Sequence, residues 1–222
     1  MANNIIKNSP PYFKQNYQYA CSLAVLRMVL ATYGINISEE ELLSRVKSDY
    51  GQDFKNIWNP TIAKIAREYK IKTTMFAEWL IFKKDIYIKA LAEFKEDSEH
   101  MNYKKYENPK DNDDLIEPLP LAYKEMFNAL ELGCRCVYGK LTANRIRSLL
   151  LQGNLIQTSI KLHILYPDKK HVFHSILIYK IDANKIDYHD PAHGESLTCD
   201  INKLIKASNN VGAAIVYSGL DK

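Results

Sequence analysis

The sequence lacks the features that mark several specialised classes of protein. It has no uninterrupted run of about 18 apolar residues, so a membrane-spanning helix is not expected. It has no basic leader followed by an apolar core and a small-residue cleavage site, so we expect no signal peptide. Its 30 basic and 26 acidic residues form no concentrated basic stripe, and no nucleic-acid motif is present. Neither a membrane nor a nucleic acid is therefore an expected partner.

Cysteine is scarce, with four residues: Cys21, Cys134, Cys136 and Cys199. Without an export signal, four cysteines are more typical of reduced thiols in the cytoplasm than of two disulfides. The 222 residues, of which 46% are hydrophobic and 25% charged, are typical of one globular domain.

The first part of the chain reads as helical. Apolar residues recur at helical spacing from Ala20 to Tyr33 and predict a largely buried helix that ends at Gly34. A capping box at Ser38 and an Asn59-Pro60 pair each predict a further helix start. The β-branched stretch 71–76 predicts a strand.

The last part of the chain reads mainly as strands. Thr142 is a predicted cap for a helix over 143–152, and strands are expected at 154–162, 171–181, 186–190 and 213–219, with a short helix after Asp200. Helices first and strands later predict an α+β fold with a mainly antiparallel sheet. We expect one domain, 1–222, with a helical lobe (about 1–76), a sheet lobe (about 140–222) and between them a helical insertion (about 78–135).

Cys21 stands where a polar, tyrosine-rich stretch becomes the apolar run of the first helix. A helix N-terminus favours a thiolate through its dipole and its free N–H groups, so Cys21 is a candidate nucleophile. The alternative is an ordinary buried cysteine, because free cysteine is among the most buried residue types.

His174 and Asp190 are candidates for a base and its orienting group. A turn at 182–185 would fold their two strands antiparallel, which brings the start of the first strand beside the end of the second. Asp190 could then orient the His174 imidazole toward a thiol. His171 is a rival base, and the Asp-Pro pair at 190–191 is also a common turn former. Gln15, six residues before Cys21, is a candidate oxyanion donor together with the Cys21 backbone N–H.

These residues, in this order, resemble those of papain-like cysteine enzymes, most closely the C39 (double-glycine) peptidase branch and its acyltransferase and amide synthase relatives. The resemblance is carried by "QNYQYAC" (15–21), "AVLRMVLATYG" (24–34), "HSILIY" (174–179) and "HDP" (189–191). It implies a papain-like fold, a Cys21–His174–Asp190 triad and Gln15 in the oxyanion hole.

The sequence also departs from that branch. Ser22 follows the candidate nucleophile where these peptidases usually carry glycine, which puts the neighbouring substrate pocket in doubt. The candidate nucleophile and base lie 153 residues apart, a longer gap than in the typical peptidase domain, and no transporter segments are attached. With 20 residues before Cys21, we expect no large inhibitory pro-segment.

A metal site is a weak alternative. Cys134 and Cys136 form Cys-x-Cys, and His189 and His193 lie close together, but neither pattern has the spacing of common zinc motifs. We expect no metal and no cofactor.

Three functions remain open. The first, which we favour, is transfer of an acyl group through a thioester acyl-enzyme to an amine, forming an amide bond in a biosynthetic pathway. Its partners would be a small-molecule or peptidyl acyl substrate, including one carried as a thioester on a carrier protein, and an amine acceptor. The second is a C39-like cysteine peptidase with water as the acceptor. The third is a non-catalytic papain-like scaffold.

Overall fold

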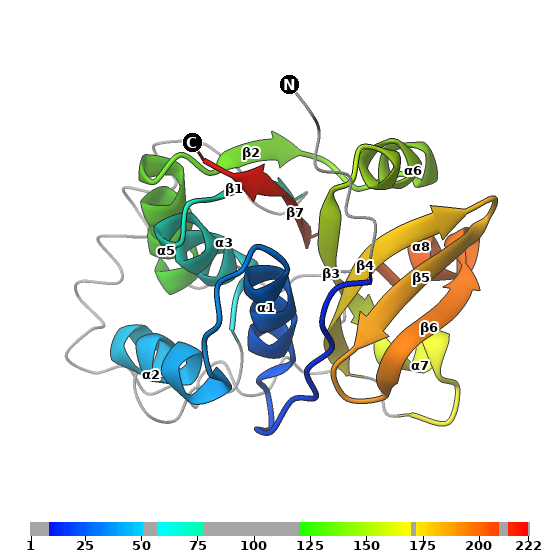
Figure 1. The fold of residues 1–222 in the computed structure, drawn as a ribbon, viewed down its shortest axis with the longest axis horizontal. Helices are drawn as coiled ribbons and strands as arrows, with labels where there is room; N and C mark the ends of the chain where they lie inside the picture. Colours follow the sequence, from blue (N-terminus) through cyan, green and yellow to red (C-terminus); the bar gives the residue numbers. More distant parts are fainter. Residues whose placement is uncertain (1–8, 51–56, 78–119, 170–171, 209–212, 222) are drawn as a thin grey trace.

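The computed structural model describes residues 9–50, 57–77, 120–169, 172–208 and 213–221 (Figure 1). Its elements in chain order are α1 (Cys21–Thr32), α2 (Glu39–Tyr50), α3 (Asn59–Glu68), β1 (Ile71–Ala77), α5 (Pro120–Glu131), β2 (Arg135–Tyr138), α6 (Ala143–Leu151), β3 (Leu155–Lys161), α7 (Leu162–Leu165), β4 (Phe173–Asp182), β5 (Lys185–Asp190), β6 (Gly194–Asp200), α8 (Ile201–Ser208) and β7 (Ala213–Leu220). In the described residues, none of the helices combines the length and apolar character that crossing a membrane requires.

One seven-stranded sheet organises the fold, with the strand order β2-β1-β7-β3-β4-β5-β6. Its neighbours pair antiparallel except for β1 and β2, which are parallel. The predicted α+β class and the mainly antiparallel sheet are therefore confirmed. The sequence did not indicate β2 or β6, which are the two edge strands. β6 shows only intermediate and exposed positions, so it lacks the buried apolar face from which a strand is predicted.

The two faces of the sheet carry separate groups of helices. Alternate residues of a strand point to opposite faces, and in β4 Leu177 joins one apolar cluster while Ile176 and Ile178 join the other. Helices α1, α2, α3 and α5 supply the first cluster, and α6, α7 and α8 supply the second, as their placement in Figure 1 shows. The predicted helical part packed on the sheet is thus confirmed.

Three of the four predicted helix N-caps are confirmed, and one is wrong. Ser38 accepts a hydrogen bond from Glu41 N at 3.0 Å, Thr142 accepts one from Arg145 N, and Asp200 accepts one from Asn202 N. Asn59 is not the cap of its helix, because α3 already includes it and the capping residue is Trp58. The proline at the next position still marks the start of that helix.

The predicted insertion lies mostly outside the described residues, which resume at residue 120. Its described end contains α5, where a helix was expected, and the start of β2. α5 packs against α3 in the first apolar cluster, and β2 pairs with β1. The end of this segment is therefore part of the core and of the sheet.

A buried hydrogen-bonded relay joins the start of α1 to the middle of the sheet. Gln157, fully buried on β3, donates from Nε2 to the Ser22 carbonyl oxygen at 3.4 Å and accepts a hydrogen bond from the Tyr217 hydroxyl at 2.7 Å. Ser22, the residue that departs from the peptidase pattern, is itself buried. The relay fixes the first turn of α1 against β3 and β7.

Replacing Gln157 tests this relay. We expect Gln157→Met to lower the free energy of unfolding by about 1–3 kcal/mol, because a buried carbonyl and a buried hydroxyl lose their partner. Chemical denaturation followed by circular dichroism measures the change. Gln152→Met is the matched control, because Gln152 is exposed and should change stability by less than about 0.5 kcal/mol. Equal effects of the two substitutions would contradict the relay.

Candidate active site

Cys21 lies at the first position of α1, a helix whose next five residues are buried. The Cys21 side chain itself is of intermediate exposure. Ala20 gives the helix no side-chain cap, and the first turn contains no acidic residue. The first N–H groups of an α-helix have no intrahelical partner and carry the positive end of the dipole, so this position favours an anion.

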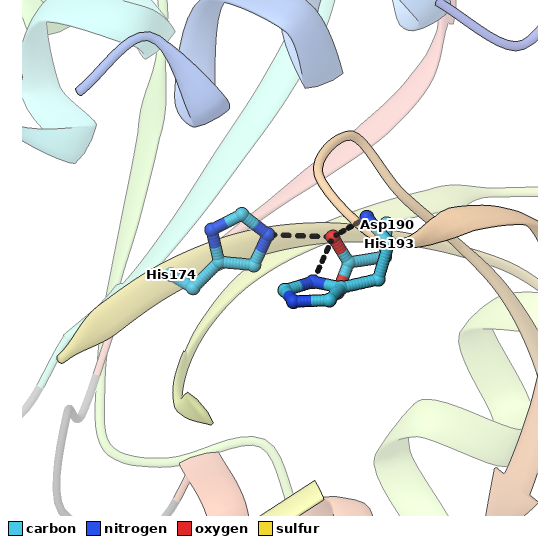
Figure 2. Close-up of side chains that lie close together, drawn as sticks. All are labelled: His174, Asp190 and His193. Carbon is cyan, nitrogen blue, oxygen red and sulfur yellow. Dashed lines mark hydrogen bonds and ion pairs between the residues drawn. The ribbon is translucent and has the colours of Figure 1, made fainter. Parts of the chain in front are cut away.

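His174 and Asp190 lie at the ends of β4 and β5 that adjoin in the sheet, as Figure 2 shows. His174 Nε2 is 2.7 Å from Asp190 Oδ1, and the two side chains are 8% and 0% exposed. The tight turn between Asp182 and Lys185 sets the register of the two strands. The expected neighbourhood of these two residues is therefore present. His171, the rival base, lies outside the described residues.

Asp190 is a buried carboxylate surrounded by donors. Its Oδ1 accepts hydrogen bonds from the backbone N–H groups of Ala192 at 2.9 Å and His193 at 3.1 Å. Its Oδ2 accepts one from the Tyr166 hydroxyl at 2.9 Å. Burial raises the pKa of Asp190, but the contact with His174 and these N–H groups outweigh it and lower the pKa to about 2. Asp190 is therefore ionised at neutral pH.

Cys21 and His174 form a coupled pair. Burial opposes ionisation of both groups, but the hydrogen bond and charge between them dominate, so the pKa of Cys21 is lowered and that of His174 is raised to about 9. Ser175 also lowers the pKa of Cys21 through its backbone and side chain, and Asp190 raises that of His174. His174 Nε2 lies against Asp190 Oδ1, so Nδ1 is the ring nitrogen that remains for a contact with the thiol.

The other cysteines have the opposite electrostatic environment. Burial raises the pKa of Cys134, that of Cys136 to about 12 and that of Cys199 to about 11. All four cysteines are free thiols. Cys21 is thus distinguished from the others by its partners.

Gln15 lies beside the turn that holds Asp190. Its backbone N–H donates to the Pro191 carbonyl oxygen at 3.0 Å, and Tyr12 nearby donates from its hydroxyl to the Asp190 carbonyl oxygen at 3.2 Å. The Gln15 side chain donates from Nε2 to Tyr17 O at 3.2 Å. An amide NH₂ has two donor hydrogens, and this bond uses one of them.

Glu39 holds the loop that leads into Cys21, a role that the sequence did not indicate. The carboxylate is fully buried and accepts hydrogen bonds from Asn16 N at 3.1 Å and Tyr17 N at 3.3 Å. Burial outweighs these donors and raises the pKa of Glu39. In the same loop Tyr19 has φ 67°, a left-handed conformation that a bulky residue adopts when its surroundings impose it.

Among the described residues, neither the Cys134–Cys136 pair nor His189 belongs to a cluster of three or more side chains that could hold a metal ion. His189 is turned toward the N-terminal segment, where Nε2 lies 2.8 Å from Pro10 O and Nδ1 accepts from Ser196 N. Ligand atoms of His174, Asp190 and His193 do cluster within 4.8 Å of one another. However, Asp190 Oδ1 is 2.7 Å and 3.1 Å from the two ring nitrogens. Tetrahedral zinc ligands lie about 3.3 Å apart, so these spacings are those of hydrogen-bonded groups.

The fold and the site thus combine an α+β architecture with a thiol, an imidazole and a carboxylate. A family model described as "Guanylylate cyclase" matches residues 11–214, and the chain belongs to this family. The matched range includes Gln15, Cys21, His174 and Asp190. No curated protein matches the chain.

Two solved structures are similar to the chain, each at 13% sequence identity. One is a double glycine motif protease from an AMS/PCAT transporter in complex with the leader peptide, with a TM-score of 0.46 over 96% of this chain and 95% of that chain. The other, from Bacillus anthracis, is described as a C39-like peptidase, with a TM-score of 0.47 over 100% of this chain and 98% of that chain.

Alkylation tests the electrostatics of the site. At about pH 6 an ordinary thiol is almost wholly protonated, and the lowered pKa of Cys21 gives it a larger thiolate fraction than the other three cysteines, whose pKa values are raised. We therefore expect iodoacetamide at this pH to label Cys21 before the other three cysteines, as read by peptide mass spectrometry. His174→Ala should remove the preference, because it removes the largest interaction that lowers the pKa. Labelling of Cys21 in the unmodified chain at the same rate as the other three cysteines would contradict the interaction between Cys21 and His174.

Proposed function

We propose that the chain is a thiol enzyme that transfers an acyl group through a thioester on Cys21. The observation that carries the proposal is the partly exposed thiol of lowered pKa, coupled to an imidazole that a buried carboxylate orients. A merely structural cysteine has no need of this environment. Cys21 is the proposed nucleophile, His174 the acid and base, and Asp190 the orienting group.

The residues divide the first half-reaction as follows. The Cys21 thiolate attacks the carbonyl carbon of an amide or thioester, and the carbonyl oxygen becomes an oxyanion. The Cys21 backbone N–H and the Gln15 amide are the proposed donors to that oxygen. As the tetrahedral intermediate collapses, the His174 imidazolium gives its proton to the leaving amine or thiol. The raised pKa of His174 keeps this proton available until the pH rises through about 9.

In the second half-reaction the acceptor attacks the thioester while His174 removes its proton. We propose an amine as the acceptor, so that the product is an amide and the Cys21 thiolate is regenerated. Transfer to an amine requires that the bound acyl group limit the access of water to the thioester. A carrier-bound thioester or a peptidyl amide suits this site as donor.

A partition experiment separates the possible acceptors. The protein is incubated with a panel of acyl thioesters and peptide amides, and the adduct is followed by intact mass spectrometry with and without added amines. We expect a thioester adduct on Cys21, absent from Cys21→Ala, that added amines consume to give amides. Hydrolysis with which no amine competes would favour the peptidase alternative. An adduct that never forms with any donor would favour the non-catalytic scaffold.

The family description motivates a second candidate, a cyclase acting on GTP. Nucleotide cyclisation would require deprotonation of the ribose 3′-hydroxyl and stabilisation of charge on the phosphates, for which His174 could serve as base and cation. Measuring cyclic GMP and pyrophosphate after incubation with GTP and Mg²⁺ or Mn²⁺ tests this candidate. Product formed equally by the unmodified chain and by Cys21→Ala would overturn the assignment of the thiol as the reacting group.

The role of Gln15 can be tested separately. We expect Gln15→Ala to lower the rate of acyl-enzyme formation by about 10²–10³, as for the loss of one oxyanion donor. Gln18→Ala is the matched control, because Gln18 is an exposed glutamine in the same loop, and it should leave the rate unchanged. An unchanged rate in Gln15→Ala would place Gln15 outside the oxyanion hole.

A further inference from the structure

A second imidazole contacts the carboxylate that orients His174. His193 Nδ1 lies 3.1 Å from Asp190 Oδ1, the same oxygen that His174 approaches at 2.7 Å. The two rings stand edge to face, with centroids 5.8 Å apart, and Figure 2 shows both directed at this oxygen. One carboxylate oxygen is therefore shared between two groups that can each carry a positive charge.

The His193 ring is held in this place by its surroundings. It stacks on the Tyr166 ring with centroids 4.5 Å apart and an interplanar angle of 21°, and Tyr166 in turn donates to Asp190 Oδ2. The backbone N–H of His193 also donates to Asp190 Oδ1. The side chain is 20% exposed, compared with 8% for His174. Solvent protons thus reach His193 more readily than they reach His174.

The contact between His193 and Asp190 depends on protonation. Nδ1 is buried and makes no well-aligned hydrogen bond, although the carboxylate oxygen is close. An ionised carboxylate only accepts hydrogen bonds, so a bare Nδ1 lone pair facing it is repulsive, whereas a proton on Nδ1 is attractive. A His193 ring with a proton on Nδ1 can therefore donate to Asp190 and hold the carboxylate beside His174.

We propose that His193 is a positioning residue of the thiol site, which sets how strongly Asp190 supports the His174 imidazolium and hence the Cys21 thiolate. The inference rests on the proposed function. When Nδ1 of His193 bears no proton, it gives Asp190 no hydrogen bond. When His193 is an imidazolium, it holds the Asp190 carboxylate beside His174 and adds a positive charge that favours the Cys21 thiolate. Reactivity in acid is thus governed by His193 as well as by the Cys21–His174 pair.

Three separate parts of the chain bring titratable groups up to the His193 ring. His174 faces it from β4, Asp190 from β5, and Tyr166 from the segment after α7. Burial raises the pKa of Tyr166 further above its ordinary range, so it stays neutral. Glu195, two residues further along the same turn, is exposed. In this group His174 and His193 are therefore the two side chains that can carry a positive charge.

The test is the pH dependence of Cys21 alkylation by iodoacetamide, which needs no substrate. His193→Asn places an amide N–H near the position of Nδ1 but cannot be protonated. We expect this variant to keep the rate at neutral pH within about twofold and to shift the acid limb to higher pH by about 0.5–1 unit, because a positive charge that favours the nearby thiolate has been removed. His193→Phe keeps a ring that can stack on Tyr166 but has no hydrogen-bond donor. We expect it to lower the alkylation rate at neutral pH, whereas His193→Asn, which keeps a donor, should retain that rate.

Tyr166→Phe is the matched control. It removes a hydrogen bond to Asp190 without removing a positive charge, so we expect a lower rate with no shift of the acid limb to higher pH. An acid limb identical in the unmodified chain and in His193→Asn would overturn the role of His193, as would a neutral-pH loss in His193→Phe that Asn does not rescue. Failure of the proposed function has a different signature, because Cys21 would then lack enhanced reactivity in every variant.

Discussion

The buried carboxylate of Asp190 is the group on which the rest of the site depends. An isolated charge in a protein interior is costly unless hydrogen bonds and an opposite charge compensate it. Here the compensation comes from β4 through His174, from the turn after β5 through two backbone N–H groups, and from Tyr166. The hydrogen bonds that compensate this one carboxylate therefore fix three parts of the chain relative to one another.

The same contact also acts on the Cys21 thiol through His174. His174 is oriented by Asp190 through Nε2, so its other ring nitrogen has a defined direction, and the pKa values of Cys21 and His174 move toward an ion pair. On the opposite side of the site, the buried Gln157 fixes the Ser22 carbonyl and Glu39 fixes the loop before Cys21. Buried polar groups thus hold the start of α1 and the ends of β4 and β5 in place around Cys21, His174 and Asp190.

The parts of the site that local sequence patterns could predict are those that local geometry determines. A two-residue reversal between two strands sets the antiparallel register, so His174 and Asp190 were expected to meet. The start of α1 at Cys21 follows from the switch to apolar helical spacing. Tyr166, Glu39 and His193 were not assigned roles, because each acts across a tertiary contact. Glu39 reads in the sequence as one of three acids in a helix first turn, where a carboxylate is normally exposed. The parallel β1–β2 pair and the Gln157 relay likewise depend on long-range packing.

The N-terminal segment is bound to the far end of the site. Pro10 contacts His189, Tyr12 contacts Asp190, and Gln15 contacts Pro191, and in Figure 1 this segment runs between α1 and the β5–β6 hairpin before it turns into α1. During synthesis on the ribosome, Cys21 emerges long before His174 and Asp190. The pKa of this thiol is therefore ordinary in the growing chain, and it is lowered when the last strands have folded. The lowered pKa is in this way a property of the folded protein, and an incomplete chain does not have it.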